Sequence, residues 1–395
     1  MLVPIVLLST VFGGTPAPLL ARLELQSDAR FLLPSPMPAQ VELSPTPPNE
    51  ATGAAPGALW GRIPFGVDDG PGLLVAIDDA AGTCRIDLNR NSNLADDPPV
   101  EWKLLDDGSP SKRWEGTWKL PLPRPKADAG VVVYHYHPEA AKVRGLSANV
   151  LFCYRDHCLR GSVRMDNRDL LLVVSDEETR GDFRYPRGRS NRIRFGLDLD
   201  GNGQLDPTSE WFDAAGSAPA VGTQQVKLIS VKPDEGTAEL LVAPPGTRLA
   251  VPFAGTDTDG KPIRFPEDFK DRLVLVDFWG SYCPHCKREL PNLIELSRKF
   301  GGRADFAIVG ISVDTPGAKE QLLNLIKEQN IGWRNLFDGQ SWQTPAVKAY
   351  GVSSVPRPVL IDTRTMTIVA DGGELRGPNL IQTVQNKLEA RAGSK

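Results

Sequence analysis

The pair Cys283 and Cys286 constrains this chain more than any other feature, because of the segments on either side of it. An apolar run, Leu273–Trp279, interrupted only by Asp277, precedes the pair and is typical of a buried strand. The stretch Cys283–Phe300 has the apolar spacing of a helix, so the two cysteines open a helix just after a short turn. A helix N-terminus carries partial positive charge and free N–H groups, which favour a thiolate. The sequence therefore predicts a pair that can be oxidised and reduced.

Two other uses of a CxxC pair fit its spacing. A structural zinc site would need a second CxxC or a CxxH, and the sequence contains neither. A static disulfide is also consistent with the spacing, but it gives the strand and the helix around the pair no role. Redox use is therefore the favoured interpretation.

The motifs around the pair resemble the thioredoxin superfamily and, within it, the TlpA/ResA-like thiol–disulfide oxidoreductases. The similarity extends over about 244–388 and is carried by ordered segments. They are Asp257–Phe265, Val276–Trp279, Glu289–Pro291, Val309–Asp314 and Tyr350–Asp362. The resemblance implies a thioredoxin-like α/β fold, protein thiol and disulfide substrates, a redox partner protein and no required cofactor.

The resemblance also implies roles for individual residues. Cys283 is expected to be the attacking thiolate and Cys286 the resolving thiol. Asp277 lies within the apolar strand, where burial should raise the pKa of its carboxyl group and let it take the proton of Cys286. The alternative for Asp277 is a pairing with a nearby lysine. Pro356 matches the family's cis-proline beside the cysteines.

The dipeptide between the cysteines matches a different branch of the superfamily. Pro284 and His285 are the pair found in the strongly oxidising DsbA family, where a stabilised thiolate makes the couple more oxidising. A DsbA-like disulfide donor is therefore the alternative to a TlpA/ResA-like reductase. Glu289 either tunes the pKa of the cysteine pair or simply faces solvent. A peroxiredoxin is disfavoured, because the first cysteine lacks a preceding Thr-x-x and has a partner at CxxC spacing.

A chain of 395 residues is too long for one ordinary domain. Its net charge of −4, with 24% charged residues, predicts no attraction to nucleic acid or to an anionic membrane. We divide it into a signal peptide (1–21), a loose Pro-rich segment (22–58), a β-rich region (59–243) and a thioredoxin-like domain (244–395).

The proposed signal peptide rests on the apolar run Met1–Phe12 and on Thr15–Ala17, which would make a small-residue cleavage site. The first basic residue of the chain is Arg22, which follows the apolar run. A mis-assigned start or a short membrane anchor is the alternative. We expect an exported protein of the periplasm or cell envelope.

Between residues 59 and 243, short β-type runs are broken by Gly, Asp, Asn and Pro, which predicts an all-β region. This region contains an internal echo, since Cys84–Trp102 parallels Phe195–Trp211. Both copies place Asp or Asn at alternate positions and end in Glu-Trp. The echo predicts two related β units.

The second copy matches part of an EF-hand-type calcium loop, although its closing acid falls one place late. The candidate ligands are Asp198, Asp200, Asn202, Gln204, Asp206 and Glu210. An Asx- and Gly-rich hairpin turn is the alternative. In the first copy Ser92 replaces the turn glycine and Pro98 occupies position 12 of the loop, so only a turn is expected there. A calcium-stabilised envelope binding protein with an accessory redox domain is accordingly a second functional hypothesis.

The remaining cysteines and histidines also carry predictions. Cys153 and Cys158 flank four residues between β-type runs, which favours a hairpin closed by a structural disulfide over a second redox pair. His135 and His137 lie on one face of a strand and, with His157, offer a metal site. Surface residues of an edge strand are the favoured interpretation of these histidines.

Overall fold

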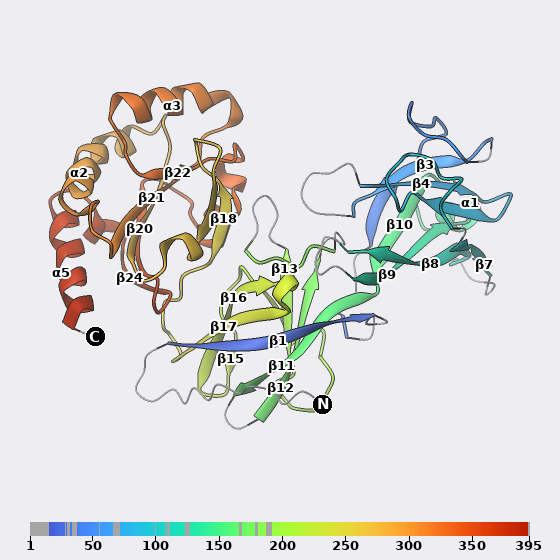
Figure 1. The fold of residues 1–395 in the computed structure, drawn as a ribbon, viewed down its shortest axis with the longest axis horizontal. Helices are drawn as coiled ribbons and strands as arrows, with labels where there is room; N and C mark the ends of the chain where they lie inside the picture. The colour runs from blue at the N-terminus through green and yellow to red at the C-terminus, as the bar shows by residue number, and fades with distance from the viewer. Residues whose placement is uncertain are drawn as a thin grey trace.

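The computed structural model describes residues 16–27, 29, 32–33, 38–54, 56–65, 72–98, 100–106, 108, 111–122, 127–165, 168–177, 181–186 and 192–393. Three sheets build the N-terminal part, and an α/β domain, coloured orange to red in Figure 1, follows it. No helix within the described ranges is both long and apolar enough to cross a membrane.

An antiparallel eight-stranded sheet forms the centre of the molecule. In spatial order its strands are β14 (Trp211–Asp213), β13 (Ile193–Leu197), β12 (Arg168–Asp176), β11 (His157–Met165), β1 (Ala17–Ser27), β17 (Thr237–Ala243), β16 (Gln224–Lys232) and β15 (Ala220–Val221). The strand β1 thus pairs on both sides, with β11 and β17. Its alternate residues Leu19, Ala21 and Leu23 are buried in the core.

The position of β1 corrects two sequence-based boundaries. The predicted signal peptide (1–21) ends inside this strand, and the predicted loose segment (22–58) contains part of β1 and all of β2 (Ala39–Glu42). The period-two alternation of β1 buries one face against the core and so outweighs the Pro-rich composition around it. The apolar run 1–12 lies outside the described residues.

Two smaller antiparallel sheets lie beside the large one. The first contains β2, β10 (Val150–Arg155), β9 (Asp128–Tyr136), β8 (Arg113–Pro121) and β7 (Lys103–Leu105). The second contains β3 (Leu59–Ile63), β4 (Leu73–Asp78), β5 (Thr83–Ile86) and β6 (Val100–Glu101), and a short helix, α1 (Pro138–Val143), follows β9. One apolar core runs through all three sheets, with members such as Ile63, Val133 and Leu172. The all-β prediction is confirmed, but the region has one shared core.

The internal echo is a loop that follows a strand in each of two different sheets. The first loop joins β5 to β6 and the second joins β13 to β14. Asp87 and Asp198 each accept two or more backbone N–H groups of their own loop. Positive φ angles of 77° and 81° at Gly201 and Gly203 recur, at 62° and 66°, at the equivalent non-glycine residues of the first loop. The two segments therefore share a turn conformation.

The predicted disulfide between Cys153 and Cys158 is wrong. Both cysteines are free and buried. Cys153 lies on β10 and Cys158 on β11, which belong to different sheets and do not form a hairpin. Because the chain passes from one sheet to the other at Asp156, the two side chains enter different apolar clusters.

The C-terminal domain is built on a five-stranded mixed sheet. In spatial order its strands are β22 (Arg334–Leu336), β21 (Phe306–Ser312), β20 (Leu273–Trp279), β23 (Arg357–Asp362) and β24 (Thr367–Asp371). Its helices are α2 (Pro284–Phe300), α3 (Lys319–Glu328), α4 (Pro345–Ala349) and α5 (Asn379–Gly393), and a hairpin of β18 (Phe253–Thr256) and β19 (Pro262–Phe265) precedes them. The strand predicted over Leu273–Trp279 and the helix predicted over Cys283–Phe300 are confirmed, whereas β18, β19, β22 and α4 were not predicted.

Side-chain alternation along β20 separates the two faces of this sheet. Leu273, Leu275 and Trp279 pack with α2 and α5, which lie side by side in Figure 1. Val274 and Phe278 pack on the other face, with α4 and the β18–β19 hairpin. Since successive side chains alternate, residue 277 points to the α2 face.

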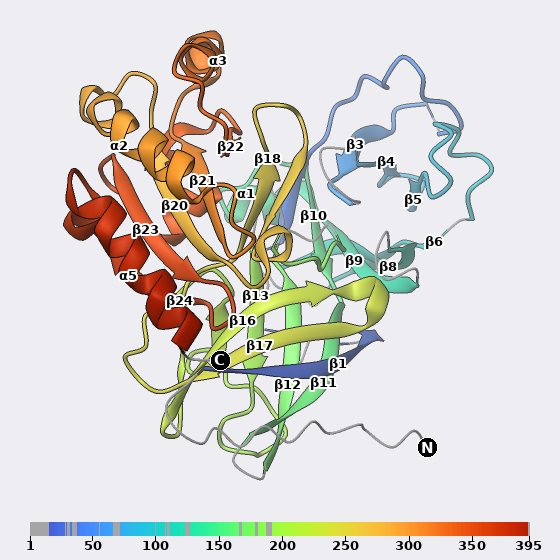
Figure 2. The same cartoon turned by 60° about the vertical axis from the view of Figure 1, so that its left-hand side comes forward.

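The two parts of the molecule share an apolar interface. Ile229 on β16 and Leu241 on β17 are buried in the same cluster as Ala250 and the α4 face of the C-terminal sheet. Figure 2 shows β16 and β17 beside the C-terminal domain. The connecting segment is held as well, because Arg248 forms an ion pair with Asp371 at 2.5 Å. The C-terminal domain is therefore packed against the β region.

Candidate active site

The turn before the cysteines is fixed by a buried carboxylate. Asp314 is fully buried just after β21, and it accepts hydrogen bonds from the backbone N–H of Ser281 at 3.0 Å and from the Ser281 hydroxyl at 2.7 Å. It also accepts a hydrogen bond from the Ser312 hydroxyl. Because β20 and β21 are parallel, their carboxyl ends meet at one edge of the sheet. This edge carries the cysteine pair.

Cys283 caps the N-terminus of α2. Its Sγ accepts a hydrogen bond from the backbone N–H of Cys286 at 3.2 Å and donates one to the carbonyl of Val355 at 3.5 Å. Both thiols are free, and the residues Cys283 and Cys286 are 6% and 2% exposed, so Cys286 is the more deeply buried residue. Burial, with the hydrogen bond to Cys283 second, holds the pKa of the Cys286 thiol well above its usual value. These features fit an outer attacking sulfur and an inner resolving one.

The segment facing Cys283 contains the predicted cis-proline. The Val355–Pro356 bond is cis, as the sequence led us to expect. The backbone carbonyl of Pro356 accepts a hydrogen bond from the guanidinium of Arg376. The segment opposite the thiol is therefore held from behind by a charged side chain.

Asp277 lies within β20 on the face that carries α2. It is 5% exposed, and burial raises the pKa of its carboxyl group to about 7, against a lowering effect of Arg376 and a raising effect of Glu289. Its carboxylate makes no hydrogen bond or ion pair with any other described residue, so the alternative of a lysine partner is not seen. A carboxyl group with this pKa can exchange a proton near neutral pH.

Glu289 and Arg376 connect α2 to the loop before α5. Glu289 is half-buried, and its carboxylate accepts hydrogen bonds from the Asn292 amide at 3.0 Å and from the backbone N–H of Gly377 at 2.9 Å. Arg376, next to Gly377, reaches Pro356. Glu289 therefore does not simply face solvent, and Arg376 is a residue that the sequence did not single out.

His285 does not contact the sulfur of Cys283 through any hydrogen bond that the described residues make. Its side chain is exposed, and its Nδ1 contacts the guanidinium of Arg288. A guanidinium only donates, so Nδ1 is the acceptor of this contact. Among the described residues, His285 therefore gives the Cys283 sulfur no stabilising hydrogen bond.

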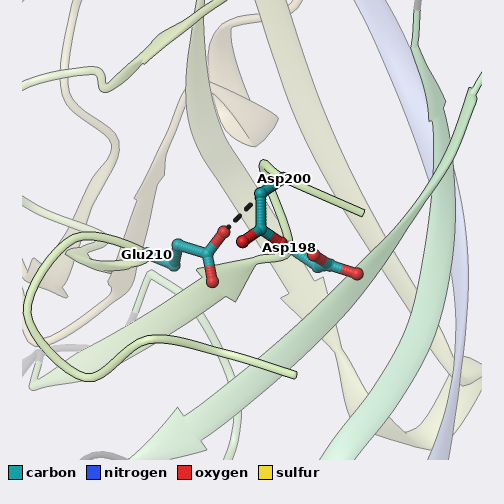
Figure 3. A group of neighbouring side chains, drawn as sticks. All are labelled: Asp198, Asp200 and Glu210. Atoms are coloured by element: carbon teal, nitrogen blue, oxygen red, sulfur yellow. Dashed lines mark hydrogen bonds between the residues drawn. The ribbon is translucent and has the colours of Figure 1, made fainter. Parts of the chain in front are cut away.

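A second candidate site is the acidic loop of the β region. Figure 3 shows Asp198, Asp200 and Glu210 gathered together, and one carboxylate oxygen of each lies within 4.8 Å of the others. Hard oxygen ligands of this kind suit calcium. Backbone N–H groups already bind these carboxylates, with Leu199 donating to Glu210 at 2.7 Å.

The other three predicted calcium ligands are not in this group. Asn202 donates its side-chain amide to Asp200 and accepts a hydrogen bond from the backbone N–H of Gln204. Asp206 turns to Thr208 and Ser209, whose hydroxyl groups hold the pKa of its carboxyl group well below the usual range. Of the four acidic candidates, Asp198, Asp200 and Glu210 therefore come together, whereas Asp206 binds its own turn.

The histidines of the β region are neither exposed nor gathered at an edge strand. His135 is 2% exposed and bonds Asp79 at 2.8 Å and the Ala148 carbonyl at 2.6 Å. His157 is fully buried and bonds the Gly130 carbonyl at 2.7 Å. The strand β9 is central in its sheet because β8 and β10 pair on either side of it. The prediction of edge-strand surface residues is wrong for His135 and His157, which are buried with hydrogen-bond partners, whereas His137 is half-buried just after β9 and caps α1.

Comparison with known proteins places the cysteine pair in a family context. Residues 271–368 match the model of a family described as thioredoxin-like. The C-terminal domain is thioredoxin-like. The thiol-disulfide oxidoreductase ResA of Bacillus thuringiensis subsp. konkukian is 30% identical over 122 residues, which are 31% of this chain and 66% of the relative. ResA of Bacillus subtilis is 27% identical over 28% of this chain and 58% of its own length.

The chain thus spans less than two thirds of the length of these relatives, and the β region lies outside the thioredoxin-like match. Among solved structures, the thioredoxin domain of a thiol-disulfide oxidoreductase from Bacteroides vulgatus is 30% identical. It covers 36% of this chain and 96% of its own, with a TM-score of 0.32.

Replacing Asp277 with asparagine tests the buried carboxyl group. The pKa of Asp277 is higher folded, about 7, than unfolded, 3.8, so the folded state binds the extra proton and stability falls as pH rises between these values. Three pKa units correspond to roughly 4 kcal/mol at most. Asp277→Asn should therefore unfold at higher denaturant concentration than the wild type at pH 8, and the gain should disappear near pH 4.

The matched control is Asp305→Asn, because a hydrogen bond from Arg303 lowers the pKa of that carboxyl group. Loss of this carboxylate should destabilise the protein at pH 8, which is opposite in sign to the effect of Asp277→Asn. Parallel stability curves of Asp277→Asn and the wild type from pH 4 to pH 8 would contradict the account.

Replacing Arg376 with glutamine removes the positive charge that lowers the pKa of Asp277. The pKa of Asp277 should rise above its value in the wild type, as followed by the carboxyl-carbon NMR signal. Arg376→Lys keeps the charge and should leave the titration close to that of the wild type. An unchanged titration in Arg376→Gln would show that this guanidinium does not act on Asp277.

Proposed function

We propose that this chain is an exported thiol–disulfide oxidoreductase, which exchanges disulfides with protein substrates through Cys283 and Cys286 as a TlpA/ResA-like reductase. One observation carries the proposal. The sulfur of Cys283 lies at the N-terminus of α2, 3.5 Å from the carbonyl before the cis-proline, with the titratable Asp277 in the strand beneath. The names of the ResA relatives agree with this activity.

The reaction begins at Cys283. Its thiolate attacks one sulfur of a substrate disulfide, a mixed disulfide forms, and the other substrate sulfur leaves as a thiolate that takes up a proton. The Val355 carbonyl, which accepts a hydrogen bond from the Cys283 thiol in the resting state, lies beside the attacking sulfur.

Resolution requires Cys286 to lose its proton. Burial opposes this loss, and the carboxylate of Asp277 supplies a nearby proton acceptor of pKa about 7. The Cys286 thiolate attacks Cys283, the second substrate sulfur leaves, and the enzyme holds the disulfide. Two electrons have passed to the substrate, so a partner must return them.

The other three cysteines are unsuited to exchange. Cys84, Cys153 and Cys158 are buried, and burial raises the pKa of each thiol, to about 12 for the last two. A thiol of this kind provides little thiolate at neutral pH. Redox titration of the whole chain should therefore report the pair Cys283–Cys286 alone.

The surroundings of the pair support the reductase direction of electron flow over the oxidase direction. A DsbA-like oxidant depends on strong stabilisation of the reduced form. Here His285 contacts Arg288 and gives the sulfur no hydrogen bond, which favours the reductase. Export is supported by the apolar run of residues 1–12.

The redox potential of the full chain tests the proposal. The full chain is used because Ile229 and Leu241 cover the C-terminal domain. Equilibration in glutathione and dithiothreitol buffers should give a value near or below that of thioredoxin, about −270 mV. Cys283→Ser should abolish the titration, and Cys84→Ala should leave it unchanged.

A potential near that of DsbA, about −120 mV, would overturn the assigned direction and favour a disulfide donor. A chain that shows no titration at all would overturn the enzyme proposal.

We propose, second, that the acidic loop binds calcium through Asp198, Asp200 and Glu210, which would stabilise the β region. The gathering of their oxygens within 4.8 Å supports this proposal. Calcium at millimolar concentration should raise the thermal midpoint of the full chain, and Asp200→Asn should reduce the rise. The first loop offers the control. There the side-chain amide of Asn91 donates a hydrogen bond to Asp96 at 2.7 Å. Asn89→Ala in this first loop should not alter the rise of the thermal midpoint with calcium. An equal midpoint with calcium and with chelator would contradict the proposal.

A further inference from the structure

A cavity of about 990 Å³ lies between the β region and the thioredoxin-like domain. One wall is the turn Asp213–Ala218 together with Gln225 and Lys227 of β16. The opposite wall includes Gln343 and residues of α4. The amide of Gln225 donates to the carbonyl of Thr247 at 2.7 Å, so the connecting segment is held against this wall. A cavity of this volume can hold a small organic molecule.

Lys227 lines this cavity, and its ammonium group has fewer acceptors than N–H donors. The residue is 2% exposed, and its ammonium donates one hydrogen bond, to the carbonyl of Gly216. An ammonium has three N–H donors, so two lack an acceptor among the described residues. Burial lowers the pKa of Lys227 to about 8, while the charge of Asp213 raises it. A buried ammonium is costly unless an anion compensates it.

Further charges around the cavity have the same sign as Lys227. Arg192 and Lys348 line it and are exposed. Asp213 is the acidic residue of the lining, and one of its carboxylate oxygens accepts a hydrogen bond from the backbone N–H of Ala215 at 2.8 Å. Three basic groups against one acid favour an anionic ligand.

The cavity also borders a turn that reaches the cysteine pair. Gln343 ends the 3₁₀ turn Ser341–Gln343, and the side chain of Trp342 in that turn lies beside that of Tyr282. Tyr282 directly precedes Cys283. A ligand in the cavity therefore contacts a segment that packs beside the active site.

We propose that this cavity binds a small organic anion whose carboxylate or phosphate group pairs with the ammonium of Lys227. Oxyanions of either kind supply acceptors for the two remaining N–H groups. The polycarboxylates and the phosphates are two sources of the same chemistry, and direct binding measurements distinguish them.

Isothermal titration calorimetry of the full chain with citrate, and separately with inorganic phosphate, tests the proposal. At least one of these anions should bind at concentrations up to about 10 mM, and the neutral compound glycerol should not. Lys227→Met keeps the volume and removes the charge, so the dissociation constant should rise at least about tenfold. Stronger binding of citrate or of phosphate identifies the source.

A second variant keeps the test independent of folding at the buried position. Lys348→Gln changes an exposed residue in the last turn of α4 and should weaken binding about two- to fivefold. Its matched control is Lys327→Gln, an exposed residue in the last turn of α3 outside the cavity lining, which should bind as the wild type does. Absence of binding by both anions, or equal binding by the wild type, Lys227→Met and Lys348→Gln, would overturn the proposal.

The anion site is independent of the proposed redox reaction. Cys283→Ser leaves every cavity residue in place and should bind the anion with the affinity of the wild type. Loss of binding in this variant would overturn the assignment of the ligand to the cavity.

Discussion

The chemistry of this molecule depends on one buried carboxyl group in the middle of a sheet. The strand β20 is paired on both sides, by β21 and β23, so all seven of its side chains are buried. Six of them are apolar, and Asp277 is the exception. Its position in the alternation places it on the α2 face, below the cysteine pair. The cost of desolvating this carboxylate is what raises its pKa to the range where it can carry a proton.

The groups around the pair form a continuous frame. Asp314 fixes the turn before Cys283, and Arg376 holds the carbonyl of Pro356 opposite it. Glu289 joins α2 to the residue after Arg376. Each contact joins segments distant in the chain, so the sulfur, the cis-proline and the buried acid keep one geometry. Because these groups already hold their positions, little reorganisation is needed when Cys283 reacts.

The sequence was sufficient for β20 and α2 because their signals, an apolar run and a helical spacing, each lie within a few residues. Pro356 was placed by the family resemblance, and β18, β19, β22 and α4 were not predicted. Arg376 was missed because its role arises from a contact across 20 residues of chain, which no spacing rule describes.

The β region was predicted less well, for two physical reasons. Leu19, Ala21 and Leu23 show the period-two pattern of a strand, but the neighbouring prolines and the apolar start of the chain hid it. The cysteines 153 and 158 have hairpin spacing, and yet the chain bends from one sheet into another between them. Which sheets share a core is decided by long-range pairing, for which a single sequence carries little information.

The most direct test of the account is to trap its first covalent intermediate. Cys286→Ser removes the resolving thiol, so the variant should accumulate a mixed disulfide with an oxidised peptide substrate. Peptide mapping by mass spectrometry should place this adduct on Cys283 alone. An adduct distributed over the other cysteines, or no adduct at all, would contradict the assignment of Cys283 as the attacking residue.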